Sequence, residues 1–407
     1  MSKLHPISSA PVIKAIPQRK SIRSAKVTGS KTIAVFGSSS SLVSRLLSPA
    51  FKEISHLYPD VNFLPLSRDS GSKTINSFPL PTISTKWVNT SDFLKHPSDY
   101  PIDGVILATP TSTHYELARL FLNRRLPVWI EKPISLPWQI DSMVELFSQS
   151  PDLFFAADFF MDSPVFLYFL KRFDYFMAQI GSPQKIEGRL VENWPLEPGR
   201  EWLLDKSING GGLGMDVLVH VLALVYQVIA RLNLPTELCI EKSEKYKYFE
   251  PGDKLPPGTE ETYMWIKATA GGLPIIIDGG KGTADHYYGI KIHGSKGSVE
   301  IFTGTDGRDT CMPYICLDTG KAPKKFWSFP GGGVGYSGLF KEFLDLVYHQ
   351  PSVDAPYALP ARAQTSLFTV KTLSQAYQLA SPTSLLCPLG ATPQVPEPIF
   401  LSPSLPN

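Results

Sequence analysis

The stretch Lys31-Thr-Ile-Ala-Val-Phe-Gly-Ser-Ser-Ser-Ser-Leu42 decides the fold class. Its apolar and β-branched part, residues 32–36, has the length and composition of a buried strand. Gly37 opens a serine-rich turn directly after that strand, and a helix is expected over 42–47. A strand, a glycine turn and a helix in this order are typical of the start of a nucleotide-binding α/β unit.

The same alternation continues to about residue 158. Apolar runs predict further strands at 61–66, 105–108 and 128–130, with helices at 115–125 and 138–147. Fully apolar strands are buried on both faces, which is typical of a parallel sheet covered by helices. Residues 31–158 are therefore expected to form a Rossmann-type, doubly wound α/β domain.

Beyond residue 158 the strands follow one another and the helices are segregated. This pattern indicates an α+β domain with a mainly antiparallel open sheet, expected to span 159–380. Its expected strands are 185–192, 237–248, 262–268, 274–278, 287–293 and 298–302, and its expected helices are 164–181, 213–232, 336–349 and 361–379.

Charge and composition exclude several classes of protein. Of the 407 residues, 39 are Lys or Arg and 37 are Asp or Glu, so the net charge of +2 leaves no basic footprint for nucleic acid. The best apolar run, 217–232, is interrupted by three polar residues and does not reach the roughly 18 residues of a membrane span. The four cysteines show no CxxC spacing. We therefore expect a small-molecule partner and no nucleic acid, membrane or metal.

The two ends of the chain differ from the rest. Residues 1–30 form a basic leader with no acidic residue before Glu53, and residues 381–407 hold seven of the 37 prolines. Both are expected to be extended and unpacked. The leader is either a solvated tail or an organelle transit peptide, since both have this bias. The expected compartment is the cytoplasm, with organelle import as the alternative.

The serine-rich turn matches a dinucleotide fingerprint only in part. Of the three glycines in G-x-G-x-x-G only Gly37 is present, and Ser39 and Leu42 take the other two places. The hydroxyl and backbone N–H groups of Ser38 and Ser39 could still hold a phosphate. A serine-capped turn without a ligand is the alternative.

The end of the second predicted strand bears on the choice of cofactor. Ser67 and Arg68 stand where an acidic residue would bind the ribose of NAD. An arginine and a hydroxyl there can bind a 2′-phosphate, which favours NADP over NAD. A surface arginine beside a turn is the alternative.

Three more motifs carry chemistry. Ala108-Thr-Pro-Thr-Ser-Thr-His114 and Glu131-Lys-Pro133 each follow a predicted strand, where the ligand crevice of an open parallel sheet lies. Gly210-Gly-Gly-Leu-Gly-Met-Asp-Val-Leu-Val-His220 opens the apolar helix, so Asp216 and His220 share one helix face. Taken singly, they read as a first-turn acid and a core histidine.

Together these motifs resemble the Gfo/Idh/MocA oxidoreductases, named for glucose-fructose oxidoreductase, inositol dehydrogenase and a rhizopine catabolism protein. The resemblance covers roughly residues 31–380. It implies that Lys132, Asp216 and His220 are catalytic, and that the chain forms a homodimer or homotetramer. It also implies that the cofactor is lined by Thr109, Pro110, His114, Glu131 and Lys132.

Hydride transfer to or from a carbinol carbon requires a proton to move at the alcohol oxygen. His220 could be the general base, Asp216 could orient it or hold a second hydroxyl, and Lys132 could polarise the carbonyl. Other polar and aromatic residues could complete a sugar-sized pocket with these three, or belong to its rim or core: Arg189 and Trp194 first, then Asn193, Arg200, Trp202, His286 and Tyr287.

The resulting hypothesis is an NAD(P)-dependent oxidoreductase acting on a secondary alcohol, or on the corresponding carbonyl or imine, of a sugar, cyclitol or related molecule. NADP is the more strongly indicated cofactor. The departure at the serine-rich turn keeps an alternative open, a non-catalytic nucleotide- or sugar-binding regulator derived from the same family.

Overall fold

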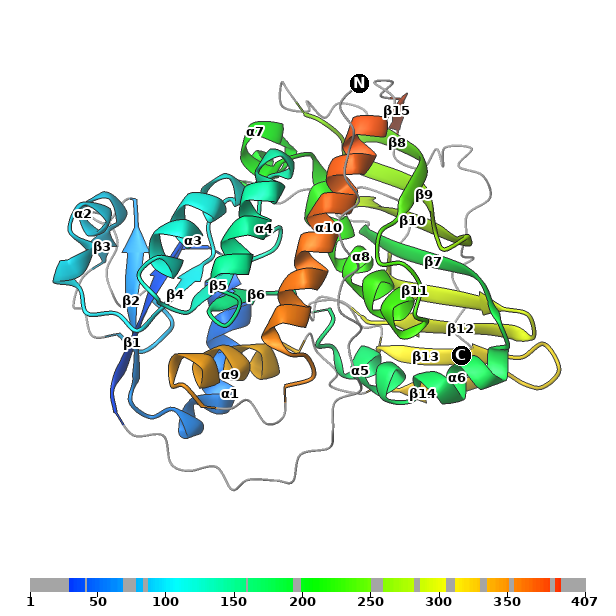
Figure 1. The fold of residues 1–407 in the computed structure, drawn as a ribbon, viewed down its shortest axis with the longest axis horizontal. Helices are drawn as coiled ribbons and strands as arrows, with labels where there is room; N and C mark the ends of the chain where they lie inside the picture. The colour runs from blue at the N-terminus through cyan, green and yellow to red at the C-terminus, as the bar shows by residue number, and fades with distance from the viewer. Residues whose placement is uncertain are drawn as a thin grey trace.

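The protein, seen in a computed structural model, forms two sheets with long helices between them (Figure 1). The structure describes residues 29–40, 42–68, 78–82, 87–158, 160–192, 199–249, 259–281, 286–304, 312–329, 335–350, 355–380 and 385–388. The leader through residue 28 and most of the proline-rich segment lie outside these ranges.

The first sheet has six strands, all parallel, in the order β3-β2-β1-β4-β5-β6. This is the strand order of dinucleotide-binding domains, and it confirms the expected doubly wound fold. The short strands β3 and β6 were not identified from the sequence. The bounds are β1 Lys31–Phe36, β2 Val61–Ser67, β3 Val88–Asn89, β4 Gly104–Leu107, β5 Val128–Ile130 and β6 Phe154–Ala156.

Helices cover both faces of this sheet because alternate strand residues are buried on each side. Ile33 and Val35 belong to one hydrophobic cluster, and Ala34 and Phe36 belong to another. The π-helical turn Val43–Leu47 and α1 (Ser48–Ile54) lie on the first side. The other helices of this part of the chain are α2 (Thr90–Lys95), α3 (His114–Leu122) and α4 (Ile140–Gln149).

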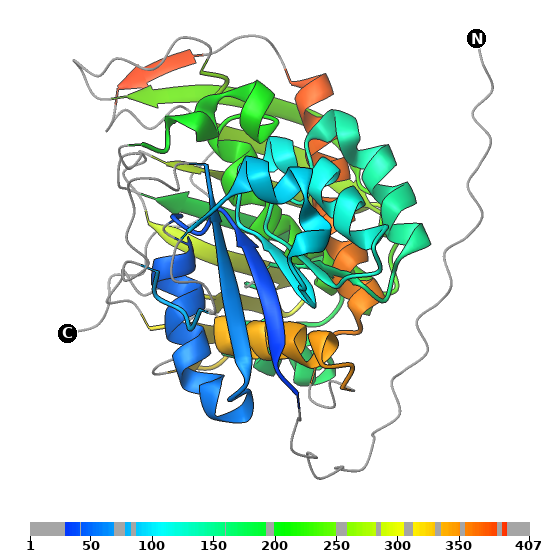
Figure 2. The ribbon, with the colours of Figure 1, turned by 90° about the vertical axis from the view of Figure 1, so that its left-hand side faces the viewer.

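A helix from near the C-terminus completes the first face. α9 (Tyr336–Val347) lies beside α1 (Figure 2), and its Phe340 and Phe343 rings contact Trp129 of β5 at centroid distances of 5.8 and 5.6 Å. The sequence placed this segment in the second domain. A parallel sheet needs both faces covered, and here the cover comes from a distant part of the chain.

The second sheet has nine strands in the order β14-β13-β12-β11-β7-β10-β9-β8-β15. It is mainly antiparallel, as expected, with parallel pairs β7/β10 and β8/β15. Its strands are β7 Pro183–Glu192, β8 Cys239–Phe249, β9 Tyr263–Ala270, β10 Leu273–Lys281, β11 Tyr287–Gly294, β12 Gly297–Phe302, β13 Tyr314–Asp318, β14 Lys325–Ser328 and β15 Leu385–Pro388.

Two expectations for the second part of the chain were wrong. The helix expected over 164–181 is two helices, α5 (Pro164–Lys171) and α6 (Phe173–Ile180); both pack on β12, and α5 extends onto β13 while α6 extends onto β11. The proline-rich C-terminal segment is not wholly unpaired, because β15 adds to the edge strand β8.

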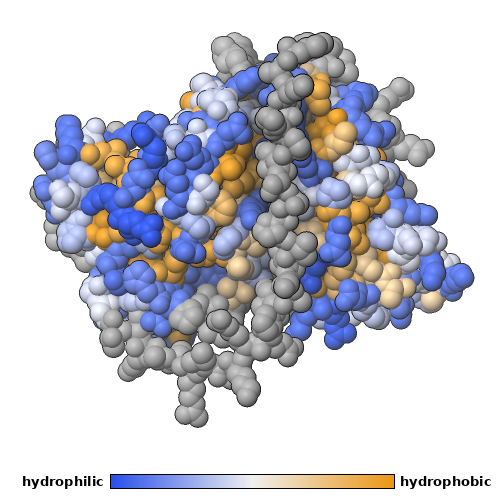
Figure 3. All heavy atoms as spheres, in the orientation of Figure 1, coloured by the Kyte–Doolittle hydropathy of each residue, from blue (hydrophilic) through white to orange (hydrophobic). Residues whose placement is uncertain are grey.

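The remaining helices are the short α7 (Lys206–Asn209) and the long α8 (Leu213–Arg231) and α10 (Leu359–Leu379). The stretch Lys206–Arg231 is long and apolar enough to span a membrane, but 89% of its most apolar window is buried inside the fold, as in a core helix. On the face shown in Figure 3, hydrophilic and hydrophobic side chains are interspersed.

Candidate active site

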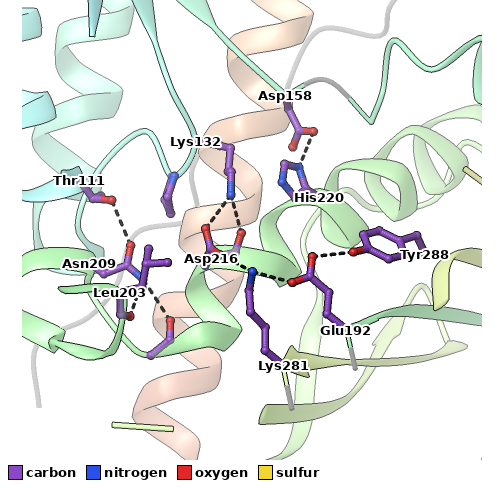
Figure 4. Close-up of polar contacts among 12 residues, drawn as sticks. Thr111, Lys132, Asp158, Glu192, Leu203, Asn209, Asp216, His220, Lys281 and Tyr288 are labelled. Carbon is purple, nitrogen blue, oxygen red and sulfur yellow. Dashed lines mark hydrogen bonds and ion pairs between the residues drawn. The ribbon is translucent and has the colours of Figure 1, made fainter. Parts of the chain in front are cut away.

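Two loops at the carboxyl edge of the first sheet face the N-terminal half of α8. Lys132 lies two residues after β5, next to a cis Lys132–Pro133 bond, and Asp158 lies two residues after β6. Asp216 and His220 project from α8 toward these loops (Figure 4). The structure therefore brings together the three residues that the sequence predicts to be catalytic.

The buried Asp216 forms an ion pair with the partly buried Lys132. The lysine Nζ lies 2.7 Å from Oδ1 and 3.0 Å from the backbone oxygen of Asp216, and Nζ of Lys281 lies 3.8 Å from Oδ2. Burial raises the pKa of the Asp216 carboxyl, but the charges of Lys132, Lys281 and Arg200 outweigh burial and hold this pKa well below its usual range. Asp216 is therefore a carboxylate near neutral pH.

Lys281, Glu192 and Tyr288 extend this network, and the sequence did not identify them. Nζ of Lys281 lies 2.6 Å from Oε2 of Glu192, and the Tyr288 hydroxyl donates to Oε1 of Glu192 over 2.6 Å (Figure 4). Burial raises the pKa of Glu192, but Lys281 more than offsets this and the net shift is downward. Acidic and basic groups thus alternate from Glu192 through Lys281 and Asp216 to Lys132.

His220 is paired with a carboxylate from the first domain. Its Nδ1 lies 3.0 Å from Oδ1 of Asp158, and both side chains are buried. The Phe160 ring packs edge-on against the imidazole at 4.6 Å. Burial lowers the pKa of His220, and the negative charge of Asp158 offsets this only in part.

All of these side chains except Asp158 line one cavity of about 130 Å³. A single water needs only roughly 10–15 Å³, so the cavity has room for a larger molecule. Basic residues outnumber acidic ones in its wall, which is made of Leu42, Arg45, Leu46, Lys132, Phe160, Leu190, Glu192, Arg200, Asp216, Val217, His220, Lys281, Tyr288 and Tyr336. A molecule with several oxygen atoms fits this chemistry.

The glycine-rich turn before α8 receives a buried glutamate. The Glu261 carboxylate accepts the backbone N–H groups of Gly212 (2.9 Å) and Gly214 (3.0 Å), and the Tyr377 hydroxyl donates to it over 2.5 Å. A Cβ on Gly212 would lie 2.1 Å from the Glu261 carbonyl oxygen, so this position requires glycine. The turn therefore anchors the helix that carries Asp216 and His220.

The serine-rich turn keeps the geometry that its one glycine provides. Gly37 has φ +74°, and a Cβ there would lie 2.2 Å from the Ala108 carbonyl oxygen. Ser39 is exposed, and the buried Ser40 Oγ has no hydrogen-bond partner among the described residues. These two hydroxyls fit a dinucleotide phosphate. Leu42 departs from the fingerprint, which has glycine at this place, and the Leu42 side chain lines the cavity.

Ser38, predicted to bind the cofactor, uses its hydroxyl to make two contacts behind the turn. Its hydroxyl donates to the Val35 carbonyl over 2.5 Å and accepts the Leu66 N–H over 3.1 Å. The second contact joins the segment after β1 to β2 behind the turn. The Ser38 hydroxyl is therefore engaged within the fold, and a contact of the Ser38 backbone N–H with a phosphate stays a prediction.

Ser67 and Arg68 lie at the carboxyl end of β2, as expected for residues that select the cofactor. Ser67 is buried and Arg68 is exposed. The backbone oxygen of Arg68 accepts a hydrogen bond from Nδ2 of Asn89 over 3.1 Å, which holds the chain at this point. Their contact with a 2′-phosphate stays a prediction.

His114 connects the two loops that follow β4 and β5. Its ring nitrogens lie 2.9 Å from the carbonyl oxygens of Pro133 and Thr109. Burial lowers the pKa of His114 to about 4. Because both nitrogens face backbone oxygens, the ring holds the loops together and does not line the cavity.

The other residues of these loops have mixed roles. Glu131 is buried and accepts the indole N–H of Trp129 over 2.9 Å, which points it away from the cavity. Pro110 precedes a short turn of helix in which Thr111 donates to Oδ1 of Asn209 over 3.2 Å (Figure 4). This contact ties the loop after β4 to the turn before α8.

Two residues that were predicted to contact the substrate lie on the face of the second sheet that points away from the cavity. Successive strand residues point to opposite faces, so Leu190 and Tyr288 line the cavity while Arg189 and Tyr287 do not. Arg189 Nε lies 3.0 Å from Oδ2 of Asp278 instead. The prediction of Arg189 as a substrate ligand is therefore wrong.

The remaining candidates of that set are distributed as follows. Arg200 lines the cavity, and Trp202 packs with Leu203 and Leu204 outside it. The His286 ring lies 4.9 Å from that of Tyr288. Asn193 and Trp194 lie outside the described residues.

Three of the missed residues, all of them charged, share a sequence signal. Glu192 and Lys281 are the last residues of β7 and β10, and Asp158 comes two residues after β6. A charged residue that ends an apolar strand was the available clue. It was not usable for Asp158, because β6 itself was not recognised.

Two family models match the chain. The model described as "Oxidoreductase family, NAD-binding Rossmann fold" matches residues 67–157, and the one described as "GFO/IDH/MocA C-terminal domain" matches residues 178–300. The first match begins after the serine-rich turn. A search of curated proteins gave no match.

Known structures share the fold over most of the chain. The 3-ketoreductase KijD10 from Actinomadura kijaniata, in complex with NADP and TDP-benzene, has a TM-score of 0.67 and 15% identity over 88% of this chain and 100% of its own. An aldose-aldose oxidoreductase from Caulobacter crescentus, complexed with glycerol, has a TM-score of 0.65 and 14% identity over 86% and 97%. At this identity the likeness concerns the fold alone.

Proposed function

Because this chain belongs to the Gfo/Idh/MocA oxidoreductase family, with its NAD(P)-binding Rossmann domain, we propose that it transfers a hydride between a nicotinamide dinucleotide and a small polar molecule. It would oxidise a secondary alcohol, or reduce the corresponding carbonyl or imine, of a sugar, cyclitol or related compound. The observation that carries this proposal is the meeting of Lys132, Asp216 and His220 in one cavity.

The nicotinamide, when bound, supplies or accepts the hydride. Lys132 handles charge at the substrate oxygen: of the three N–H donors of an ammonium, two are directed at Asp216, and the third can be donated to a carbonyl or alcohol oxygen. His220 exchanges the proton of the alcohol. Its lowered pKa favours the neutral imidazole, which is the form that accepts a proton.

NADP is the proposed cofactor, supported by the exposed Arg68 at the end of β2. Arg68→Ala should raise the Kd for NADPH by roughly tenfold and leave the Kd for NADH unchanged, since only NADPH carries the 2′-phosphate. Arg119→Ala is the matched control, because Arg119 is an exposed arginine that pairs with Glu116 on α3. Equal effects on both cofactors would overturn the preference.

A second candidate is a non-catalytic nucleotide- or sugar-binding regulator. The observation in its favour is Leu42, which takes the place of the third fingerprint glycine and turns its side chain into the cavity. This function predicts binding without turnover.

A substrate panel distinguishes the two functions. The full chain with NADPH or NADP is offered ketoses, keto-sugars, cyclitols and imines, and nicotinamide absorbance is followed. We expect turnover that falls at least roughly 100-fold in Lys132→Met. Lys245→Met is the control, since Lys245 is a mostly buried lysine on β8 with its own partner, Glu260. Cofactor binding without turnover on any substrate would favour the regulator.

A further inference from the structure

The distance between the loops after β5 and β6 is similar to the distance between residues four apart on α8. β5 and β6 pair in parallel with Ile130 opposite Ala156, so Lys132 and Asp158 each come two residues after paired positions. Neighbouring strands lie about 4.8 Å apart. Side chains four residues apart on a helix lie at a similar spacing of about 5–6 Å. Two adjacent strand ends can therefore each meet one residue of an i, i+4 pair.

Both contacts are made. Lys132 meets Asp216 at 2.7 Å, and Asp158 meets His220 at 3.0 Å (Figure 4). Asp158 is 2% exposed, and its Oδ1 also accepts the backbone N–H of Phe160 at 3.3 Å. The Asp158 carboxylate is thus fixed both by a hydrogen bond within its own loop and by its contact with the imidazole.

We propose that Asp158 is a positioning residue, which fixes His220 with Nδ1 protonated and so makes Nε2 the basic nitrogen of the cavity. A carboxylate only accepts hydrogen bonds, so the nitrogen that faces it must carry the proton. The inference rests on the proposed function, in which His220 exchanges a proton with substrate. It adds to the site a residue of the first domain that neither the motifs nor the comparisons identify.

If Asp158 positions His220, its negative charge also affects the pKa of the imidazole, which a residue that only packs against the ring would not do. The charged groups facing His220 are Asp158 from the loop after β6, Lys132 from the loop after β5 and Asp216 on its own helix. The negative charge of Asp158 raises the pKa of the imidazole. Asp158→Asn should therefore lower that pKa and move the acidic limb of the rate profile to lower pH, while the plateau falls by at least roughly tenfold.

The direct test is the tautomer of His220, read from ¹⁵N NMR of histidine-labelled full chain, with His220→Gln to assign the signal. In the wild type we expect Nδ1 protonated and Nε2 unprotonated at neutral pH. In Asp158→Ala the Nε2-protonated form should increase. Asp345→Ala is the control, because Asp345 is a buried carboxylate that bonds Tyr58 and Lys341 instead.

A wild-type His220 with Nε2 protonated would overturn the proposal, even if the Asp158 variants fail to fold. An unchanged tautomer in folded Asp158→Ala would also overturn it. The NMR test needs no substrate, so a missing turnover would count against the proposed function alone.

Discussion

At the scale of single residues, Asp216 supports the site by balancing charge. Asp216→Asn should remove the charged partner of the partly buried Lys132 ammonium and lower the free energy of unfolding by about 2–3 kcal/mol. Turnover should be lost with it, because Lys132 is no longer oriented. Chemical denaturation checks the first effect. Asp318→Asn, at a more exposed ion pair with Lys324, should change stability by less than about 0.5 kcal/mol; equal losses in the two variants would contradict this account.

Single residues also show which parts of the candidate site could be predicted from the sequence. Lys132, Asp216 and His220 were found because motif and helix spacing specify their position. Arg189 and Tyr287 were chosen one residue away from Leu190 and Tyr288, which line the cavity. In a strand a shift of one residue reverses the face, and nothing in the local sequence shows which face meets the site.

At the scale of elements, the position of α8 depends on the carboxylate at its N-terminus. Glu261→Ala would leave the Gly214 N–H and the Tyr377 hydroxyl without their acceptor, and the Gly212 N–H with only its longer contact to Tyr377. An unpaired buried polar group costs about 1–3 kcal/mol, and we expect a loss of at least this size in thermal unfolding. Glu237→Gln, at an exposed ion pair, should be neutral. A melting temperature unchanged in Glu261→Ala would refute the anchoring role.

Elements were predictable where the local pattern was long. The longer strands and α8 follow from strong apolar runs, and β5, although it has only three residues, is apolar and rich in β-branched residues. β3, β6 and β14 have two to four residues each and lack such a β-branched run. Strands this short form because a neighbour supplies the hydrogen bonds, so their sequence carries little signal. The break between α5 and α6 likewise depends on the sheet beneath them.

At the scale of the whole molecule, Arg362 links α10 to α9, to β6 and to the segment after β6. This arginine is fully buried, pairs with Asp162 at 2.6 and 2.9 Å and with Glu342 at 2.8 Å, and lies over the Phe155 ring. Arg362→Ala should cost about 3–5 kcal/mol, since two acids lose their partner. Lys371→Ala, at a half-exposed lysine of the same helix, should cost less than about 1 kcal/mol in the same denaturation experiment. A mild Arg362→Ala phenotype would argue against this linkage.

Stability should also depend on pH through buried acids. Burial raises the pKa of Glu131 from 4.5 to about 7, with the Trp129 hydrogen bond opposing it. Between pH 4.5 and 7 the folded chain therefore keeps the proton on Glu131 while the unfolded chain releases it. The free energy of unfolding consequently falls as pH rises from 4.5 to 7. Glu131→Gln removes this loss, so its melting temperature relative to wild type should rise across that window. Parallel curves would contradict the shift.

Whether this chain binds a nicotinamide dinucleotide is tested most directly by titrating the full chain with NADPH and following the nicotinamide fluorescence. We expect saturable binding, tighter than that of NADH, because the proposed dinucleotide site consists of the first sheet, the turn at Gly37 and Arg68. No binding of either nicotinamide cofactor at millimolar concentration would contradict it.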